Sequence, residues 1–323
     1  MNDHDACIIL NMLNGLGGLS AWKRRGSHVN ALIEACGSIS AVLESDVDTL
    51  SRIDGVSAEL AGRITHWREL IEFRRELDIS KNEGVTILCR TDDEYPDSLR
   101  SLDNPPLCLY LLGSLPVEFA ARSIAIVGTR APSDFGIRMA RDFSKAAVRE
   151  GWSTVSGLAS GIDTAAHQST IEAGGRTVAV LGSGIAKVYP PENTELARAI
   201  VRSGGAIVSE YPMNTESTRC TLPRRNRIIA GLSCCTLVVE ASERSGALMT
   251  AEYAAKRGCR VFAVPGEADN PVAVGCNSLI RQGAKPVTEF DDILTVRYEG
   301  GNASGTNQKS PSSNLQESRT LST

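Results

Sequence analysis

The sequence predicts an α/β protein in which a doubly wound, mostly parallel sheet follows a small all-helical domain. From about residue 85 onward, short runs rich in Val, Ile and Thr alternate with helix-like segments, which is typical of parallel βαβ units. Glycine is abundant, with 29 residues, while aromatic residues make up only 5% of the chain. This composition suits tight turns between strands and helices better than a β-sandwich.

Residues 1–80 predict a small helical domain, because β-branched runs are absent and glycines interrupt short apolar segments. These glycines are Gly15, Gly17, Gly18, Gly26, Gly37, Gly55 and Gly62. The segment 50–57, followed by Ala61 and Ile64, resembles a helix-hairpin-helix motif, whose hairpin amides face DNA phosphates. Ser57 stands where that motif prefers glycine, so a structural bundle of the sterile-alpha-motif kind stays open as well.

Residues 81–298 predict the main domain, an extended Rossmann-like sheet. The expected strands are 85–89, 107–112, 123–127, 152–156, 177–181, 206–209, 236–239 and 260–264, and a helix is expected over 136–150. The strands are largely apolar without alternation, which predicts helices on both faces of the sheet. The segment 299–323 is rich in Ser, Gly, Asn and Gln. We expect it to be a disordered polar tail without a winged-helix domain.

Charge and cysteine usage exclude several classes of protein. The balance of 34 Lys+Arg against 38 Asp+Glu excludes a wholly basic coat, so any anion site must be a local concentration of charge. The nine cysteines are scattered without a Cys-x-x-Cys pair, which favours reduced thiols over a disulfide framework or a zinc ribbon. We therefore expect no metal and no cofactor. Apolar runs are too short for a membrane span or a signal sequence, so a cytoplasmic location is expected.

Glycine-rich turns follow most of the expected strands, at 128–130, 156–161, 181–184 and 245–247. The carboxyl ends of parallel strands meet at one edge of a sheet, where glycine N–H groups and helix N-termini bind phosphates. None of these turns is a dinucleotide-binding fingerprint, because its third glycine would fall at Lys187. A Walker A motif is also absent, and a nicotinamide oxidoreductase is disfavoured.

The segment 219–227 is the most informative stretch. It contains Arg219, Arg224, Arg225 and Arg227, and no acidic residue lies between 216 and 240. Pro223 predicts a helix start with the arginines in its first turn, where cations oppose the helix dipole unless an anion is bound. With Arg130 and Lys187 expected at the same edge, this predicts a site for a string of phosphates. The alternative is a solvated basic face or ion pairs with neighbouring acids.

Other polar residues give weaker signals. Asp163 and His167 share a face of a predicted helix, which favours a helix-stabilising pair over a metal or acid–base site. For Glu240, at the end of a strand, an arginine partner is a simpler explanation than general-base catalysis. Neither a Ser/His/Asp arrangement nor a pair of catalytic carboxylates is recognisable, so the sequence predicts a protein that is not an enzyme.

Together these motifs resemble the DNA-processing protein A family (DprA, also called Smf), over about residues 13–294. The motifs are Tyr95-Pro96, Asn104-Pro105-Pro106, 126–130, 156–163 with His167, Tyr189-Pro190, Glu192-Asn193, 225–233, Ser245-Gly246, 264–266 and Gly283-Ala284. The resemblance implies a homodimeric, non-enzymatic protein that binds single-stranded DNA. It also implies protection of incoming DNA in natural transformation, loading of RecA recombinase, and displacement of single-strand-binding protein.

The resemblance also implies a DNA site on the glycine-rich edge of the sheet. Its residues are Arg130, Ser156, Gly157, Lys187, Tyr189, Arg225, Asn226, Arg227, Ser245 and Gly246. The glycine turn at 181–184 and the arginine segment add Gly182, Gly184 and Arg224 as candidates for the same site. Tyr189 is the candidate for stacking on a base. The chain departs from the family pattern at Leu222, where the family usually has phenylalanine, and many members carry a winged-helix domain after the sheet.

Two other functions stay open. One is a nucleotide-processing enzyme on the same scaffold, such as a nucleoside-monophosphate phosphoribohydrolase. That enzyme needs a Pro-Gly-Gly-x-Gly-Thr-x-x-Glu motif, and the segment 264–267 does not continue in that way. The other is a sensor that binds a small nucleotide and no polymer.

Overall fold

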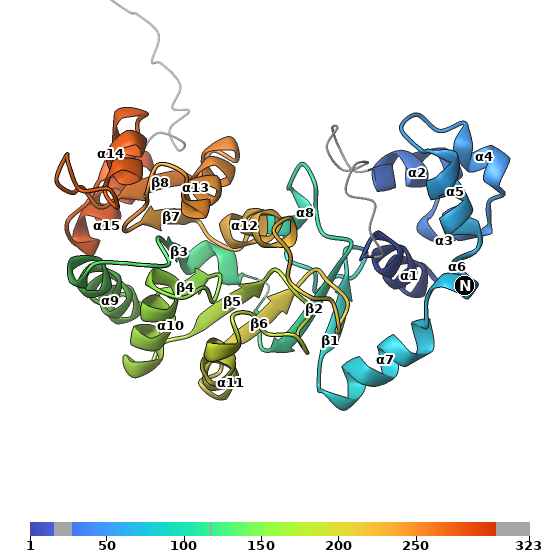
Figure 1. Ribbon diagram of the computed structural model, residues 1–323, viewed down its shortest axis with the longest axis horizontal. Helices are drawn as coiled ribbons and strands as arrows, with labels where there is room; N and C mark the ends of the chain where they lie inside the picture. The colour runs from blue at the N-terminus through green and yellow to red at the C-terminus, as the bar shows by residue number, and fades with distance from the viewer. Residues whose placement is uncertain (16–27, 117, 302–323) are drawn as a thin grey trace, which may run out of the picture.

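The computed structural model describes residues 1–15, 28–116 and 118–301 (Figure 1). Within these residues a nine-stranded sheet has the strand order β1-β2-β6-β5-β4-β3-β7-β8-β9. Its strands are β1 (Thr86–Cys89), β2 (Cys108–Gly113), β3 (Ser123–Val127), β4 (Ser153–Ser156), β5 (Thr177–Leu181), β6 (Ala206–Ser209), β7 (Cys235–Val238), β8 (Arg260–Ala263) and β9 (Lys285–Pro286). Strands β3 to β9 pair in parallel, while β1 and β2 are antiparallel at one edge. The predicted fold class is confirmed.

The order of the strands changes direction at β3. From β3 the chain adds β4, β5 and β6 toward one edge, and it then returns to place β7, β8 and β9 toward the other. Strands β3 and β7 are therefore neighbours whose connections leave in opposite directions. A crevice opens at the carboxyl ends of such strands, and open α/β sheets bind their ligands there.

Both faces of the sheet are buried, as continuous apolar strands require. Along β3, Ile124 and Ile126 belong to one buried cluster, while Ala125 and Val127 belong to the other. Helices α9 (Asp134–Arg149), α10 (Ile162–Glu172), α11 (Thr194–Arg202) and α15 (Phe290–Gly301) cover one face (Figure 1). Helices α8 (Asp97–Arg100), α12 (Thr221–Gly231), α13 (Gly246–Lys256) and α14 (Val274–Arg281) cover the other.

The N-terminal part is helical, as predicted. It contains α1 (Asp3–Gly15), α2 (His28–Cys36), α3 (Ile39–Glu44), α4 (Val47–Ser51), α5 (Ala58–Thr65), α6 (Trp67–Leu70) and α7 (Phe73–Asn82). Ser57 caps α5, because its hydroxyl accepts the N–H of Leu60 at 3.1 Å. This role explains a serine where a helix-hairpin-helix motif prefers glycine. Apolar residues of α1 and α4 share one buried cluster with Tyr110 and Ile207 of the sheet.

The element boundaries differ from the prediction in small ways. The short β9 was not predicted, because two exposed residues carry no periodic signal. Helix α15 extends to Gly301 and so crosses the predicted boundary at 298. The rest of the predicted tail, and Gly17, Gly18 and Gly26, lie outside the described residues. The division of the chain at residue 80 stays a prediction.

Among the described residues, no helix combines the length and the apolar composition needed to cross a bilayer.

Candidate functional site

A pocket of about 270 Å³ lies at the carboxyl ends of β3 and β7, where the order of the strands changes direction. Residues 127–130 follow β3, and residues 242–247 follow β7 and begin α13. Helix α12 closes a further side with Arg225 and Asn226. Of the site residues expected from the sequence, the structure brings together Arg130, Arg225, Asn226, Ser245 and Gly246.

Arg225 is the central side chain of this pocket, although it is only 5% exposed. Its Nη1 donates to the backbone carbonyls of Gly157 and Val180, at the ends of β4 and β5. Its Nε donates to Oδ1 of Asn226 at 3.1 Å. In the part of the chain that the structure describes, Nη2 has no acceptor. One nitrogen of an otherwise fixed guanidinium is thus left available to a ligand.

The charges around Arg225 are only partly balanced. Burial lowers the pKa of Arg225 to about 10, the carboxyl of Asp163 opposes this effect, and the charge of Arg130 adds to it. Burial also raises the pKa of Asp163, against the influence of Arg225 and the N–H groups of Ala159 and Gly157. Arg130 is exposed and forms no ion pair with any other described residue. Two guanidinium groups and one carboxyl leave excess positive charge, which suits an anion.

The N-terminus of α13 lies at the same pocket. Ser245 is its N-cap, with the hydroxyl accepting the N–H of Ala247 at 3.3 Å, and Gly246 is the first helical residue. A side chain at Gly246 would meet no atom within 4 Å, so this end of the helix is open. Asn226 supports it by donating from Nδ2 to the carbonyl of Gly246 at 3.0 Å. Free N–H groups and the helix dipole add to the preference for an anion.

Arg227 has a different position from Arg225. Its Nη1 and Nη2 donate to the two carboxylate oxygens of Glu210 at 2.8 and 2.6 Å, and its Nε donates to the carbonyl of Asn104 at 2.9 Å. Arg227 therefore forms an ion pair where the sequence predicted a contact with an anionic ligand, and its acidic partner is Glu210 rather than Glu240. Arg224 is half-buried and does not line the pocket.

The arginines also lie later in their helix than predicted. Helix α12 begins at Thr221, whose N–H is accepted by the hydroxyl of Thr218 at 3.0 Å. Arg225 and Arg227 are therefore in the second turn. Pro223 remains in the first turn, where its missing N–H has no cost.

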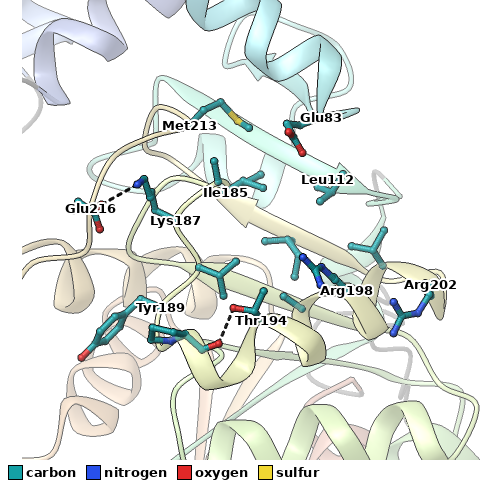
Figure 2. A pocket seen from close by; sticks show the side chains of 16 residues that line it. Glu83, Leu112, Ile185, Lys187, Tyr189, Thr194, Arg198, Arg202, Met213 and Glu216 are labelled. Carbon is teal, nitrogen blue, oxygen red and sulfur yellow. Dashed lines mark hydrogen bonds and ion pairs between the residues drawn. The ribbon is translucent and has the colours of Figure 1, made fainter.

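Lys187 and Tyr189 do not reach this pocket. They line a separate cavity of about 700 Å³ beside α11, which Figure 2 shows. Lys187 pairs with Glu216 at 3.2 Å, and both side chains are largely exposed. Tyr189 is 40% exposed, so its ring is accessible. The expected convergence of Arg130 and Lys187 on one anion site is therefore not observed, because the 182–188 loop bonds instead to the loop at 212–215.

The other expected residues are buried parts of the scaffold. Ser156 donates its hydroxyl to the carbonyl of Ile126 at 2.6 Å and has no exposed surface. A Cβ on Gly157 would lie 2.3 Å from Cζ of Arg225, so only glycine leaves room for that guanidinium. Gly182 and Gly184 likewise allow close approach of the backbone of α12 and of the 212–213 segment.

The predicted pair of Asp163 and His167 does not form. Asp163 accepts the N–H groups of Gly157 and Ala159 at 3.0 and 3.4 Å and thus holds the turn after β4. The Nδ1 of His167 bonds to the hydroxyl of Thr177 at 2.7 Å.

The expected arginine partner of Glu240 is also wrong. Glu240 accepts the N–H and the hydroxyl of Ser133, at 2.9 and 2.5 Å. The carboxylate thereby stabilises the N-terminus of α9, since a negative charge is favourable at that end of a helix.

Five polar or glycine positions line the pocket without having been named as site residues: Gly128, Thr129, Asp163, Ser242 and Thr250. Gly128 and Thr129 belong to the glycine-rich turn expected at 128–130, whereas Thr250 lies within α13, where no turn signal marks it.

Residues 86–297 match the family model described as DNA recombination-mediator protein A. The chain belongs to this family. Protein Smf of Synechocystis is 40% identical over 248 residues, which cover 76% of this chain and 62% of that protein. DNA processing protein DprA of Bacillus subtilis is 40% identical over 220 residues, which cover 68% of this chain and 74% of that protein. This chain thus spans less than two thirds of its Synechocystis relative.

Two solved structures have the same fold. The X-ray structure of DNA processing protein A from Streptococcus pneumoniae superposes with a TM-score of 0.73 at 30% identity, covering 90% of this chain and 97% of that one. A structure of the Helicobacter pylori protein, described as revealing its single-stranded DNA binding mode, has a TM-score of 0.60 at 23% identity and covers 67% of this chain and 96% of that one. The family description names a recombination mediator and not an enzyme, in agreement with the sequence prediction.

Proposed function

We propose that this chain binds single-stranded DNA and that a backbone phosphate occupies the pocket between β3 and β7. The observation that carries this proposal is the available Nη2 of the buried Arg225, beside the exposed guanidinium of Arg130 and the open N-terminus of α13. A buried, preorganised guanidinium loses little side-chain entropy when it binds an anion. Charge-assisted hydrogen bonds to phosphate are also among the strongest in proteins.

The size of the pocket favours one nucleotide unit of a polymer over a whole dinucleotide cofactor. Its 270 Å³ is below the roughly 300–1,000 Å³ that small-molecule sites occupy. A flexible single strand can turn one phosphate into such a recess more readily than a stiff duplex can. The single-stranded DNA bound by the Helicobacter pylori protein, which shares the fold, supports the same polymer.

The separate cavity with Lys187 and Tyr189 provides a second contact for a longer strand. Tyr189 would stack on a base, and Lys187 would exchange Glu216 for a phosphate. Oligonucleotides long enough to cover both places should therefore bind more tightly than those that fill the first pocket alone.

Family membership supports a wider role, which we propose on the same basis. The protein would act as a homodimer in the cytoplasm, protect incoming single strands in natural transformation, displace single-strand-binding protein and load RecA recombinase. The test is RecA-dependent ATP hydrolysis on a single strand covered with single-strand-binding protein. A shorter lag with this chain is expected, and an unchanged lag would reject the loading role while leaving DNA binding untouched.

Fluorescence anisotropy with labelled oligo-dT of graded length, across a salt series, tests the binding itself. We expect affinity to rise with length, to fall with salt, and to exceed the affinity for duplex of equal length in competition. The Arg130→Ala variant should bind roughly 10–150-fold more weakly, because a charge-assisted hydrogen bond of about 1.5–3 kcal/mol is lost. Its salt slope should decrease by about 0.7 for each phosphate contact removed.

The matched control is Arg141→Ala, which removes an exposed arginine on α9 that does not line the pocket. It should change neither affinity nor slope. Equal binding of duplex and single strand at physiological salt would reject the proposal. Saturation by AMP with displacement of the oligonucleotide would favour the nucleotide sensor, and release of products beyond stoichiometry would favour the nucleotide-processing enzyme.

A further inference from the structure

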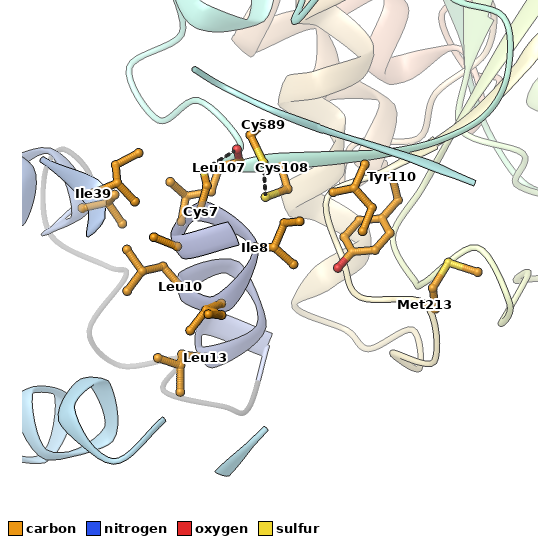
Figure 3. Packing of buried hydrophobic residues seen from close by; sticks show 14 of the residues in the cluster. Cys7, Ile8, Leu10, Leu13, Ile39, Cys89, Leu107, Cys108, Tyr110 and Met213 are labelled. Carbon is orange, nitrogen blue, oxygen red and sulfur yellow. Dashed lines mark hydrogen bonds between the residues drawn. The ribbon is translucent and has the colours of Figure 1, made fainter. Parts of the chain in front are cut away.

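Three cysteines that are far apart in the sequence meet in the interior, where the N-terminal helices contact the sheet. Cys7 lies in α1, Cys89 is the last residue of β1, and Cys108 is the first residue of β2. Cys89 and Cys108 stand directly opposite each other in the antiparallel pair. All three side chains are fully buried. Figure 3 shows Cys89 facing Cys108, with Cys7 on the adjoining helix α1.

The spacing of the sulfur atoms fits a tetrahedral metal ion. The Sγ atoms of Cys89 and Cys108 are 3.7 Å apart, and the three sulfurs all lie within 4.8 Å of one another. Zinc–thiolate bonds of about 2.3 Å place two sulfurs of a tetrahedron roughly 3.8 Å apart. A disulfide would instead need the two sulfurs at about 2.05 Å, and it would leave the third thiol unpaired.

A histidine and a carboxylate adjoin one of the three thiols, that of Cys89. His4 lies three residues before Cys7 in α1, so the two side chains share one face of the helix. A ring nitrogen of His4, Sγ of Cys89 and a carboxylate oxygen of Asp92 also lie within 4.8 Å of one another. Asp92 bonds Nδ1 of His4 at 3.1 Å and accepts the N–H of Cys89 at 2.8 Å. A carboxylate on the second ring nitrogen is the usual means of orienting a zinc-bound histidine.

We propose that Cys7, Cys89, Cys108 and His4 bind one zinc ion, and that Asp92 orients His4. On binding, the three thiols each release a proton to solvent, and the neutral imidazole donates its lone pair from the nitrogen that Asp92 does not hold. The thiols now donate to carbonyls, Cys7 to Leu107 at 3.2 Å and Cys89 to His4 at 3.5 Å, and these bonds are given up. The ion would join α1 to the antiparallel pair of β1 and β2.

This site lies apart from the DNA pocket, since none of its residues lines that pocket. Its consequence is structural: the metal would fix the helical part of the chain to the edge of the sheet. Three thiolates with one histidine form a closed ligand set, which is typical of structural rather than catalytic zinc. Metal binding would add directly to the free energy of folding.

The first experiment uses the full-length chain produced in zinc-supplemented medium and measures bound metal by elemental analysis. We expect one equivalent of zinc. Replacement by cobalt should give an intense thiolate-to-cobalt charge-transfer band, with d–d bands of tetrahedral intensity. Cys7→Ser, Cys89→Ser and Cys108→Ser should each weaken that band, because one of three thiolate ligands is lost, while the matched control Cys276→Ser, equally buried but outside the cluster, should keep it unchanged.

The fourth ligand and its support are tested by zinc affinity in competition with a chromophoric chelator. Asp92→Asn should weaken binding roughly 10–100-fold, and His4→Gln should weaken it at least as much. Unchanged affinity in both variants would overturn the assignment of His4. A zinc-free wild-type chain that gives no cobalt charge-transfer band would overturn the site, independently of whether any variant folds. An unreduced chain two hydrogens lighter, with Cys89 joined to Cys108, would overturn it in favour of a disulfide.

Discussion

Replacing Arg227 by alanine tests whether the charge of this arginine stabilises the fold or binds DNA. The guanidinium of Arg227 makes a two-point contact with the carboxylate of Glu210 and also bonds the carbonyl of Asn104. The two charged side chains are only 10% and 15% exposed. The substitution leaves Glu210 with a negative charge in a poorly hydrated place and leaves the Asn104 carbonyl without its donor.

The expected cost follows from this geometry. Removing one partner of a buried ion pair destabilises a protein by about 3–5 kcal/mol. The residual exposure of Glu210 favours the lower part of that range, about 3–4 kcal/mol, and the melting temperature should fall by roughly 6–16 °C. The double variant Arg227→Ala with Glu210→Ala should recover part of this loss, because neither charge is then left unpaired.

Urea denaturation gives the change in stability, and salt-dependent anisotropy with oligo-dT gives the change in binding. We expect Arg227→Ala to lower the denaturation midpoint while its folded fraction keeps the wild-type salt slope. A normal midpoint together with a slope reduced by about 0.7 would refute the reasoning. That result would mean that Arg227 leaves Glu210 and contacts a phosphate.

Three further predictions concern a buried titration, a close approach and an exposed lysine. Burial and Arg225 lower the pKa of His167 to about 3, so below about pH 6.5 the unfolded state binds a proton that the folded state does not. The free energy of unfolding should therefore fall as the pH decreases from about 6.5. The His167→Asn variant should reduce the slope of stability against pH by roughly 1.4 kcal/mol per pH unit. Gly157→Ala should displace the guanidinium of Arg225 and weaken binding of single-stranded DNA about tenfold or more. The control Gly62→Ala lies in open space within α5 and should raise the free energy of unfolding, measured by urea denaturation, by about 0.4–1 kcal/mol. Lys187→Ala should leave the melting temperature nearly unchanged, since exposed ion pairs contribute about 0–1 kcal/mol, and should weaken binding of long oligo-dT but not of short oligo-dT.

The sequence by itself determined the layers of the fold. Ser123–Val127, Thr177–Leu181 and Ala206–Ser209 were predicted with the bounds that the structure has. This success has a local cause, because a strand buried on both faces is largely apolar, and glycine turns mark the ends of the first two of these strands. The edge that carries the pocket follows from the same pattern, since parallel strands all end on one side.

The tertiary structure alone decided what individual charged side chains do at that edge. Arg225 and Arg227 are two residues apart, and on a helix this separation turns them roughly 200° from each other. One therefore reaches the ends of β4 and β5, and the other reaches Glu210. Both lie in the same arginine-rich stretch, so the amino-acid composition around them could not show which one is available to a ligand and which one is paired.

The three cysteines show the same limit more strongly. Positions 7, 89 and 108 have no spacing that predicts a metal site, and the sequence indicated separate reduced thiols. They meet because α1 packs on the antiparallel pair of β1 and β2 and because the strand register sets Cys89 against Cys108. Periodicity in a sequence specifies which face of an element is buried, whereas the partner across that face depends on contacts between residues distant along the chain, which only the folded structure specifies.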